Sequence, residues 1–419
     1  MVMLVVVVVV AGSVAAYALV HGLRSSPGGV AAVAVTTMPV ASSTPASSPV
    51  AAATSSAAKA KAKAKAKAKA KAKAKAKANA AKGANSGSGK PTPTTTTTAP
   101  QAVTITAVGD MELGNTPNVP ADPAGYLQPM VAVLAAPVVF ANLEGTLTDA
   151  TGSKCGASSS NCYAFRNPPS FAAGLRSSGF TVLNSANNHA HDFGAQGVAD
   201  TTAALQSAGI VQGGLPGQIG LQKIGTATVA FVDFAPYSNT NNLLDLAGAK
   251  TLIAQARTQA DVVVVYMHAG AEGTAATHVT GSEESYVGED RGNAKVFAHA
   301  AVDDGADLVI GSGPHVLRGI EAYKGRVIDY SLGNFAGDGN FATSGVLAMS
   351  GVLTVTVTHG DAPATGRFTS LVLSAQGRPS VDPSGAAATF VNQLSTADFG
   401  PAAVIIQPSG QLTMPALPA

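Results

Sequence analysis

Five apolar runs between residues 102 and 316 alternate with stretches of helical pattern, and each run ends in polar side chains. Continuous apolar strands that alternate with helices are typical of an α/β fold with buried sheets. Ligands of such sheets collect in crevices at the carboxyl ends of the strands. We therefore expect one polar site to be built from the run-end residues, which are Asp110, Asn142, Glu144, Asn187, Asn188, His189, His268 and His315.

The charge of the chain changes abruptly near residue 101. The first hundred residues contain no Asp or Glu and have 13 Lys and Arg, a charge of +13. The rest holds all 24 acids against 26 − 13 = 13 basic residues, a charge of −11, so the net +2 is a cancellation between two unlike regions. We predict a folded domain over residues 102–405 and a tail over residues 406–419.

Residues 2–20 are nearly all apolar. At about 1.5 Å per residue such a helix just crosses a bilayer core of about 30 Å. The segment fits an uncleaved anchor, or a signal peptide cleaved after Ala16-Tyr17-Ala18. A buried core helix is the less specific alternative. We predict a signal peptide or membrane anchor over residues 1–24, and an extracytoplasmic protein that is membrane-anchored or secreted.

Residues 25–101 are rich in Ala, Lys, Ser, Thr and Pro, and lysines alternate with alanines from Lys59 to Lys77. Such a composition buries too little apolar surface to offset the entropy of ordering, which predicts a disordered linker. The lysines either attract an anionic envelope polymer or a membrane surface, or form a solvated spacer. Nucleic acid is not expected as a partner, because the chain has an export-type segment and no aromatic residues among the lysines.

The run-end residue types suit divalent metal ions, which in two-metal sites need a bridging carboxylate, further oxygen donors and neutral imidazoles. In the stretch NSANNHAHDFG we interpret Asn188 as a ligand through its amide oxygen, and His189 as the general acid that protonates a leaving group. Asp192 would orient the His189 ring. The simpler interpretation is a crowded polar turn in which Asp192 only caps the following helix.

Six motifs in order give the body a family resemblance: AVGDMELG, ANLEGTL, NSANNHAHDFGAQGVADT, VVVYMHAGAE, AVDDGADLVIGSGPHVLRGIE and IDYSLGNFAGD. The chain resembles CapA-type proteins of poly-γ-glutamate capsule synthesis, a branch of the calcineurin-like metallophosphoesterase superfamily. The resemblance implies a four-layer α/β/β/α sandwich of the metallophosphatase type, with one or two divalent ions (Mn, Fe or Zn) at the strand ends. It implies a metal-ligand set of Asp110, Glu144 as the bridging carboxylate, Asn188, His268 and His315.

Two departures from the superfamily pattern concern the number of metal ions. Glu112 stands where a His usually follows the first Asp, and Gly313 stands where the first His of a His-Pro-His motif would be. Glu112 is either a substitute ligand or a loop acid. Around this ligand set we expect Asn142, Glu272 and Asn334 to contact substrate or to support the ligands.

Cys155 and Cys162 are the only cysteines. In an exported protein they favour a disulfide, with two inert thiols as the alternative. Taken together, the sequence predicts an exported protein of capsule, poly-γ-glutamate or envelope-polymer synthesis, acting as a metal-dependent hydrolase or transferase on an anionic polymer. The alternative is a non-catalytic, tethered protein that binds the polymer with a degraded metal site.

Overall fold

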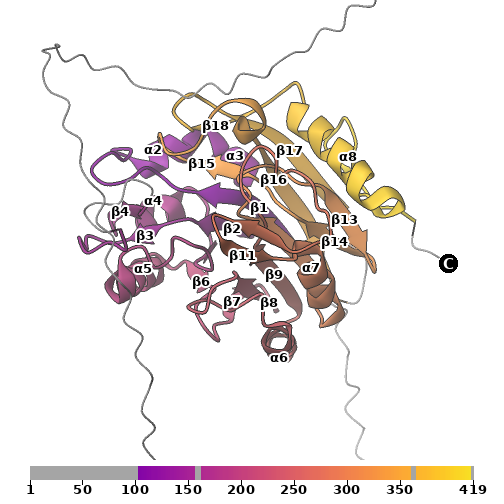
Figure 1. Ribbon diagram of the computed structural model, residues 1–419, viewed down its shortest axis with the longest axis horizontal. Helices are drawn as coiled ribbons and strands as arrows, with labels where there is room; N and C mark the ends of the chain where they lie inside the picture. The colour runs from indigo at the N-terminus through magenta and orange to yellow at the C-terminus, as the bar shows by residue number, and fades with distance from the viewer. Residues whose placement is uncertain (1–101, 156–161, 360–364, 417–419) are drawn as a thin grey trace, which may run out of the picture. The chain divides into compact units, whose positions relative to one another are not determined.

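Two mixed β-sheets lie face to face in the computed structural model, which describes residues 102–155, 162–359 and 365–416 (Figure 1). The segments predicted over residues 1–24 and 25–101 lie outside the described residues. Among the helices that are described, none is long and apolar enough to cross a membrane.

The first sheet has eight strands, and its centre is parallel. The path β18-β17-β16-β1-β2-β5-β6 is parallel from β1 to β6 and antiparallel from β1 to β18, and β15 adds to β1 in parallel. The strands are β1 (Val103–Met111), β2 (Val138–Leu143), β5 (Val182–Asn184), β6 (Val211–Gly213), β15 (Asn334–Ala336), β16 (Met349–Val357), β17 (Thr365–Leu373) and β18 (Pro379–Val381).

The second sheet has six strands in the order β13-β14-β12-β9-β8-β7, and β8, β9, β12 and β14 run parallel. Its strands are β7 (Gly220–Ile224), β8 (Ala227–Phe234), β9 (Val262–His268), β12 (Leu308–Ser312), β13 (Ile320–Tyr323) and β14 (Arg326–Asp329). Every residue of β9 is buried, as expected for a central strand covered on both faces.

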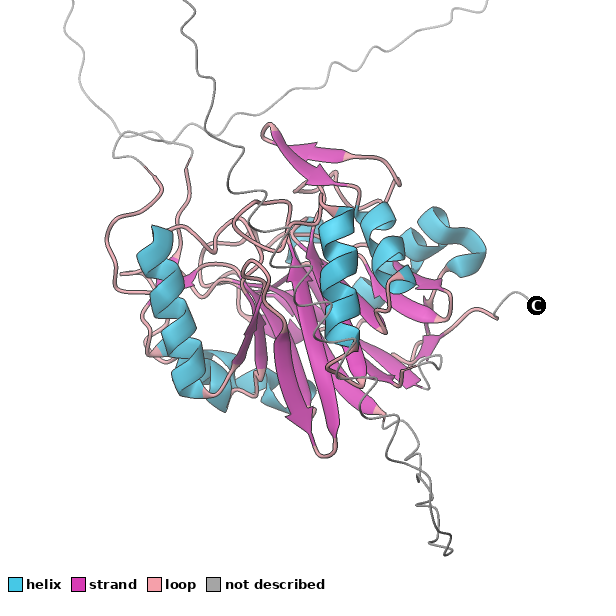
Figure 2. Cartoon of the chain, turned by 90° about the horizontal axis from the view of Figure 1, so that it is seen from below, coloured by secondary structure: helices cyan, strands magenta, loops and turns pink. Residues whose placement is uncertain are grey.

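Helices cover the outer face of each sheet, and Figure 2 shows them on both sides of the strands. The first sheet packs against α2 (Pro123–Leu127), α3 (Val131–Leu134), α4 (Phe171–Ser177) and α5 (Gly194–Ala208), and the second against α6 (Leu246–Arg257) and α7 (Ala294–Asp303). The described body is therefore a four-layer α/β/β/α sandwich, which confirms the predicted fold class.

Local signals in the sequence explain where these helices begin and end. Asn293 caps α7 by accepting from the backbone N–H of Val296, and Asp245 caps α6 in the same way. Gly209 ends α5 in the left-handed conformation, with a φ of 68°. Short 3-10 turns adjoin other elements: η1 (Gln128–Met130), η2 (Gly345–Ala348) and η3 (Gly400–Ala402).

The core between the sheets is apolar and centred on aromatic rings. Phe140 on β2 stacks on Phe231 of β8 with ring centroids 5.8 Å apart, and it contacts the ring of Tyr266 at 5.3 Å. Helix α8 (Ala386–Phe399) contributes Ala387 and Val391 to the same core. This packing fixes the two sheets against each other, so that strand ends from both can share one site.

Three two-stranded pieces complete the described elements. They are β3 (Thr146–Leu147) with β4 (Arg166–Asn167), β10 (Glu284–Tyr286) with β11 (Glu289–Gly292), and β19 (Ile405–Ile406) with β20 (Leu412–Thr413). The segment predicted as a tail from residue 406 thus begins with a small antiparallel hairpin.

Candidate metal centre

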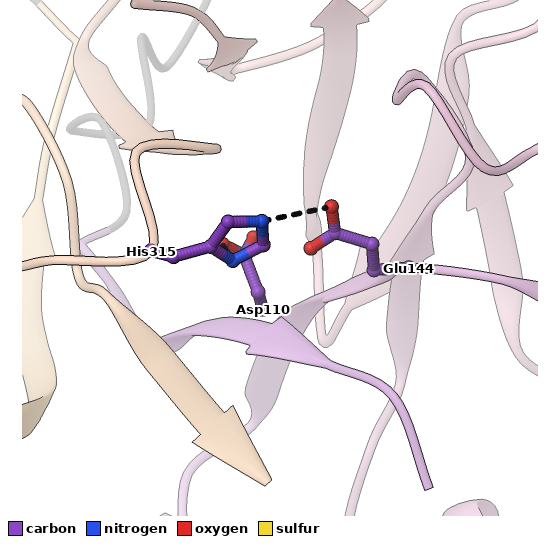
Figure 3. Close-up of side chains that lie close together, drawn as sticks. All are labelled: Asp110, Glu144 and His315. Carbon is purple, nitrogen blue, oxygen red and sulfur yellow. Dashed lines mark ion pairs between the residues drawn. The ribbon is translucent and has the colours of Figure 1, made fainter. Parts of the chain in front are cut away.

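Three side chains from both sheets converge at the strand ends. Asp110 belongs to β1, Glu144 follows β2, and His315 follows β12 (Figure 3). One ligand atom from each lies within 4.8 Å of the others. The Nδ1 of His315 is 3.3 Å from Asp110 Oδ2, and its Nε2 is 3.7 Å from Glu144 Oε1. Three of the five predicted metal ligands therefore share one small volume.

Gly109 allows β1 to reach this position. The backbone N–H of Asp110 donates to Gly333 O at 2.9 Å, and a Cβ on Gly109 would lie 1.8 Å from that same oxygen. Only a residue without a side chain permits so close a backbone approach. Asp110 is thereby set in register with Asn142 on β2 and Asn334 on β15.

Asp110 is fully buried and stays ionised because of its partners. It accepts hydrogen bonds from the Ser312 hydroxyl, from Asn142 Nδ2 at 2.7 Å, and from the Gly313 N–H at 3.2 Å. Burial alone would raise the pKa of Asp110, but the hydrogen bond and positive charge of His315 outweigh it and hold the pKa well below its usual range.

Glu144 is buried with one oxygen unused. Its Oε1 has no hydrogen-bond partner among the described residues. Burial, and then the nearby charge of Asp110, raise the pKa of Glu144 well above its usual value. Two buried carboxyl groups this close repel each other when both are ionised, and a cation between them removes that cost.

His268 brings a neutral imidazole to the same place. It ends β9, is fully buried, and its Nε2 lies 3.9 Å from Glu144 Oε1 without a hydrogen-bond partner in the described part of the chain. Burial lowers the pKa of His268 to about 3, so the ring is neutral, which is the state that binds metals. The Tyr266 hydroxyl lies 3.4 Å from its Nδ1.

His315 is held by its backbone as well as its side chain. Its φ of 58° is left-handed, which is uncommon outside glycine and concentrates at functional sites. Its Nδ1 lies 2.8 Å from Asn334 Oδ1, which places the predicted supporting residue Asn334 against a ligand. Burial would lower the pKa of His315, but the carboxylates of Glu144 and Asp110 raise it to about 10.

Asn142 connects the two carboxyl groups. Its amide nitrogen donates to Asp110 at 2.7 Å and reaches Glu144 Oε2 at 3.4 Å. Its amide oxygen accepts from Asn184 at 2.6 Å and from Asn187 at 2.9 Å. Asn142 therefore supports the ligands rather than facing the cavity, in line with one of the two roles predicted for it.

The side chains of His189 and Asp192 are in direct contact. The Nδ1 of His189 is 2.8 Å from Asp192 Oδ2, and Asp192 also pairs with Lys154 at 2.7 Å. The backbone N–H of Phe165 donates to the same Asp192 oxygen at 2.6 Å. Burial lowers the pKa of His189 against the opposing effect of Asp192, which favours a neutral ring that accepts a proton before it can donate one.

The remaining predicted residues lie around two adjoining cavities. One cavity of about 280 Å³ is lined by Glu144, His189, Glu272, His315 and Asn334. Asn188 lines the neighbouring cavity, and its amide oxygen has no hydrogen-bond partner among the described residues. Glu272 pairs with Arg291 at 2.5 Å and lies 3.8 Å from His315 Nε2.

Glu112 and Gly313 are the two departures from the superfamily pattern, and the structure shows what surrounds each of them. The Glu112 carboxylate accepts a hydrogen bond from Asn340 and does not join the Asp110–Glu144–His315 cluster, which favours a loop acid over a substitute ligand. Gly313 has a φ of 110°, and a Cβ there would lie 3.1 Å from His268 Nε2. The position next to His268 is therefore one that a side chain enters only with strain.

Cys155 and Cys162 form a disulfide in the structure; the residues between them, 156–161, lie outside the described residues. Cys162 lines the larger of the two cavities.

Ser312, Tyr266, Asn184 and Arg291 contact the site but were not singled out from the sequence. Two of them carry a signal that pattern alone could have used. Tyr266 lies two residues before His268 on one strand, so both point to the same face. Ser312 is in register with His268 on the neighbouring strand. Arg291 comes from a hairpin that no periodicity connects with the site.

Comparison with known proteins identifies the family of the chain. The family model described as bacterial capsule synthesis protein PGA_cap matches residues 104–339. The PGA biosynthesis protein CapA of Bacillus subtilis (strain 168) is 39% identical over 181 residues, which cover 39% of this chain and 44% of that protein. The capsule biosynthesis protein CapA of Bacillus anthracis is 32% identical over 187 residues, covering 39% of this chain and 42% of that protein.

The matched region is thus less than half the length of either relative. Among solved structures, a Staphylococcus aureus protein provisionally assigned as a 5′-nucleotidase aligns at 14% identity over 67% of this chain and 53% of its own, with a TM-score of 0.34. That score is too low to support an inference. Because the family model spans more than half of the sequence, this chain belongs to the bacterial capsule synthesis protein PGA_cap family.

Proposed function

We propose that this protein binds one or two divalent metal ions at the strand ends and uses them in hydrolytic or transfer chemistry during the synthesis of a capsule or envelope polymer. The observation that carries the proposal is the convergence of Asp110, Glu144 and His315 within 4.8 Å, with His268 beside them. Family membership supports the link to capsule synthesis and does not by itself name a reaction.

The residues present fit a divalent cation. Two buried carboxyl groups, a neutral imidazole and an amide supply the oxygen and nitrogen donors that Mn, Fe or Zn accept. Three of these donor atoms are left without a partner in the described residues: Glu144 Oε1, Asn188 Oδ1 and His268 Nε2. Buried polar atoms rarely lack partners, and Glu144 Oε1 and His268 Nε2 lie only 3.9 Å apart, so this pair supports a missing ligand. When bound, such an ion supplies Lewis-acid activation of an electrophile.

The chain's own residues account for orientation and proton transfer. Asp192 fixes the His189 ring through Nδ1, which leaves Nε2 as the atom that exchanges a proton with the substrate. His189 and Glu144 line the same cavity, so the proton-transferring group and the ligands address one bound molecule. Asn142 and Asn334 hold Asp110 and His315 through hydrogen bonds.

We also propose that the protein acts outside the cytoplasm, tethered or secreted through residues 2–20, and that its substrate is an anionic envelope polymer such as polyglutamate. The support is in the sequence, where an apolar segment precedes a lysine-rich arm. The acidic body would repel such a polymer, and bound metal and the basic arm offer the compensating charge.

The deciding experiment is elemental analysis of the purified residues 101–419 and of the same protein carrying His268→Ala. The proposal predicts one or two equivalents of Mn, Fe or Zn in the wild type and a loss of metal in the variant. Two equivalents would show that the site is complete without an imidazole at position 313. Protein that takes up no metal after reconstitution would overturn the proposed enzyme.

Gly313 favours a second candidate function. Its backbone conformation and its approach to His268 would strain the imidazole that the superfamily pattern places there. A site reduced in this way suits a tethered protein that binds an anionic polymer without turnover. That candidate predicts salt-sensitive polymer binding that survives chelation and weakens when residues 58–90 are deleted. Binding that vanishes with the metal would exclude it.

A further inference from the structure

A second cavity of about 600 Å³ adjoins the candidate metal centre. The two cavities share four lining residues, which are Tyr163, His189, Glu272 and Tyr286. A molecule that contacts His189 in one cavity is therefore next to the other cavity and can extend into it. The second cavity is also lined by Arg291, which offers a guanidinium group to such a molecule.

Arg291 is buried to an unusual degree for an arginine, with 2% of its surface exposed. Its Nη2 donates to Glu272 at 2.5 Å. Its Nη1 and Nε have no hydrogen-bond partner among the described residues, although Nε lies 3.3 Å from Glu289 Oε2. Buried donors are normally satisfied, so the unpartnered Nη1 and Nε of this guanidinium point to a group that binds there.

The surroundings of Arg291 hold it in place. The rings of Tyr237 and Tyr286 lie 5.9 and 5.6 Å from its guanidinium carbon, a cation–π arrangement. Its backbone oxygen accepts from the N–H of Gly270, two residues after His268. The β10–β11 hairpin that carries Arg291 is thereby tied to the loop that carries the candidate ligand. A rigid guanidinium loses little entropy when it binds a partner.

Two carboxylates already face the Arg291 guanidinium, so an anion binds there by displacing the weaker partner. Glu272 is largely buried and balances one charge. Glu289 is half-exposed, with 51% of its side chain accessible, and is also held by the Tyr237 hydroxyl at 3.0 Å. Lys154 lines the same cavity, although it pairs with Asp192. An incoming oxyanion thus competes with Glu289 alone for the Nε side, and with no described residue for Nη1.

We propose that this cavity is a subsite for an oxyanion of the substrate, a carboxylate or a phosphate, anchored by Arg291. A planar guanidinium matches both groups through charge-assisted hydrogen bonds. The role of this cavity as a substrate subsite rests on the proposed function, because an anchored substrate would have its reacting bond positioned next to the metal centre. Its affinity for a free oxyanion does not depend on turnover or on metal.

Calorimetric titration of the full chain after exhaustive chelation tests the subsite apart from the metal chemistry. Inorganic phosphate and glutarate are the two probes, and the tighter one identifies the source of the oxyanion. Arg291→Lys keeps the positive charge but lacks the planar set of guanidinium N–H donors. We therefore expect the affinity for the probe to weaken about tenfold, or about 1.4 kcal/mol. Glu289→Gln removes the competing carboxylate and should tighten binding several-fold.

Arg378→Lys is the matched control, because Arg378 lies near Tyr126 and outside both cavities, and its affinity should equal that of the wild type. If Arg291→Lys misfolds, the double variant Arg291→Gln/Glu272→Gln removes both charges of the pair and must still lose the binding. Wild-type protein that binds neither probe, or an Arg291→Lys variant of unchanged affinity, overturns the subsite. Phosphate or glutarate binding in protein that takes up no metal would retain the subsite and reject the proposed function.

Discussion

The body holds two sets of buried carboxyl groups that differ in what surrounds them. Asp110 and Glu144 lie at strand ends among imidazoles and amides. Asp233 and Asp329 lie on the second sheet, each in register with a residue of the core between the sheets, Tyr266 and Ile310. Both oxygens of Asp233, and one of Asp329, have no hydrogen-bond partner among the described residues.

Asp110 responds to burial differently from the other three acids, because burial also raises the pKa of Glu144. Burial raises the pKa of Asp233 to about 8, and it raises the pKa of Asp329 well above its usual value. Asp110 is just as buried, but His315 keeps it ionised. A buried acid without partners retains its proton, whereas one with cationic and amide partners keeps its charge. Imidazole and amide partners therefore distinguish Asp110, which stays ionised, from Asp233 and Asp329, which keep a proton.

The largest expected effect concerns Asp233. With a folded pKa of about 8 and an ordinary unfolded value, the folded state keeps a proton that the unfolded state loses as pH rises. Stability should therefore fall between about pH 4 and pH 8, by roughly 5 kcal/mol at most. Urea unfolding at pH 5 and pH 8 should show roughly 3–4 kcal/mol of this loss in the wild type and a smaller loss in Asp233→Asn. Equal losses in the two proteins would contradict the expected protonation.

Added metal should raise the free energy of unfolding through Asp110 and Glu144, and not through Asp233. At a thousandfold excess over Kd, a bound ion raises the free energy of unfolding by about 4 kcal/mol. We expect this rise in the wild type and in Asp233→Asn, measured by urea unfolding at pH 7 with and without Mn or Zn. Glu144→Gln, which keeps the shape and removes the charge, should lose it. A full rise in Glu144→Gln would remove Glu144 from the ligand set.

Removing an amide that supports the ligands should lower metal affinity less than removing a ligand does. Asn142→Ala removes the hydrogen bonds to Asp110 and Glu144, and residues that hold metal ligands typically cost 10–100-fold in metal affinity. Competition with a fluorescent chelator measures that change. Asn392→Ala is the matched control, because the Asn392 side chain also makes two hydrogen bonds, with the backbone of Ile406, but far along the chain on α8. Equal metal affinities in the two variants would assign Asn142 a purely structural role.

Much of this architecture could be predicted from local sequence. Apolar runs ending in Asp110, His268 and His315 indicated parallel strands whose ends meet, and the structure places them together. The His189–Asp192 contact followed from a spacing of three residues. Gly209, which directly follows α5, is a local signal for the end of that helix.

Other parts of the site depend on contacts that no local pattern records. Arg291 reaches the cavity through a hairpin whose position is set by Glu272 and by the backbone of Gly270. Asn184 reaches Asn142 because β2 and β5 pair in parallel, a register that the sequence does not specify. The protonated state of Asp233 depends on burial between sheets, which is a property of the packed core.

The smallest expected effect is a loss of unfolding free energy when Gly313, next to the candidate metal centre, is replaced by alanine. Gly313→Ala meets a backbone φ of 110° and atoms of the His268 ring at 3.1–3.2 Å, whereas Gly179→Ala meets a φ of 107° and nothing within 4 Å. A φ in this range costs an alanine roughly 1–3 kcal/mol, so both variants should lose a similar amount of unfolding free energy. The further loss in Gly313→Ala, about 1 kcal/mol by thermal or urea unfolding, measures the displacement of His268. If the two alanines cost the same, the His268 ring yields freely, and the missing imidazole reflects the backbone conformation of residue 313 alone.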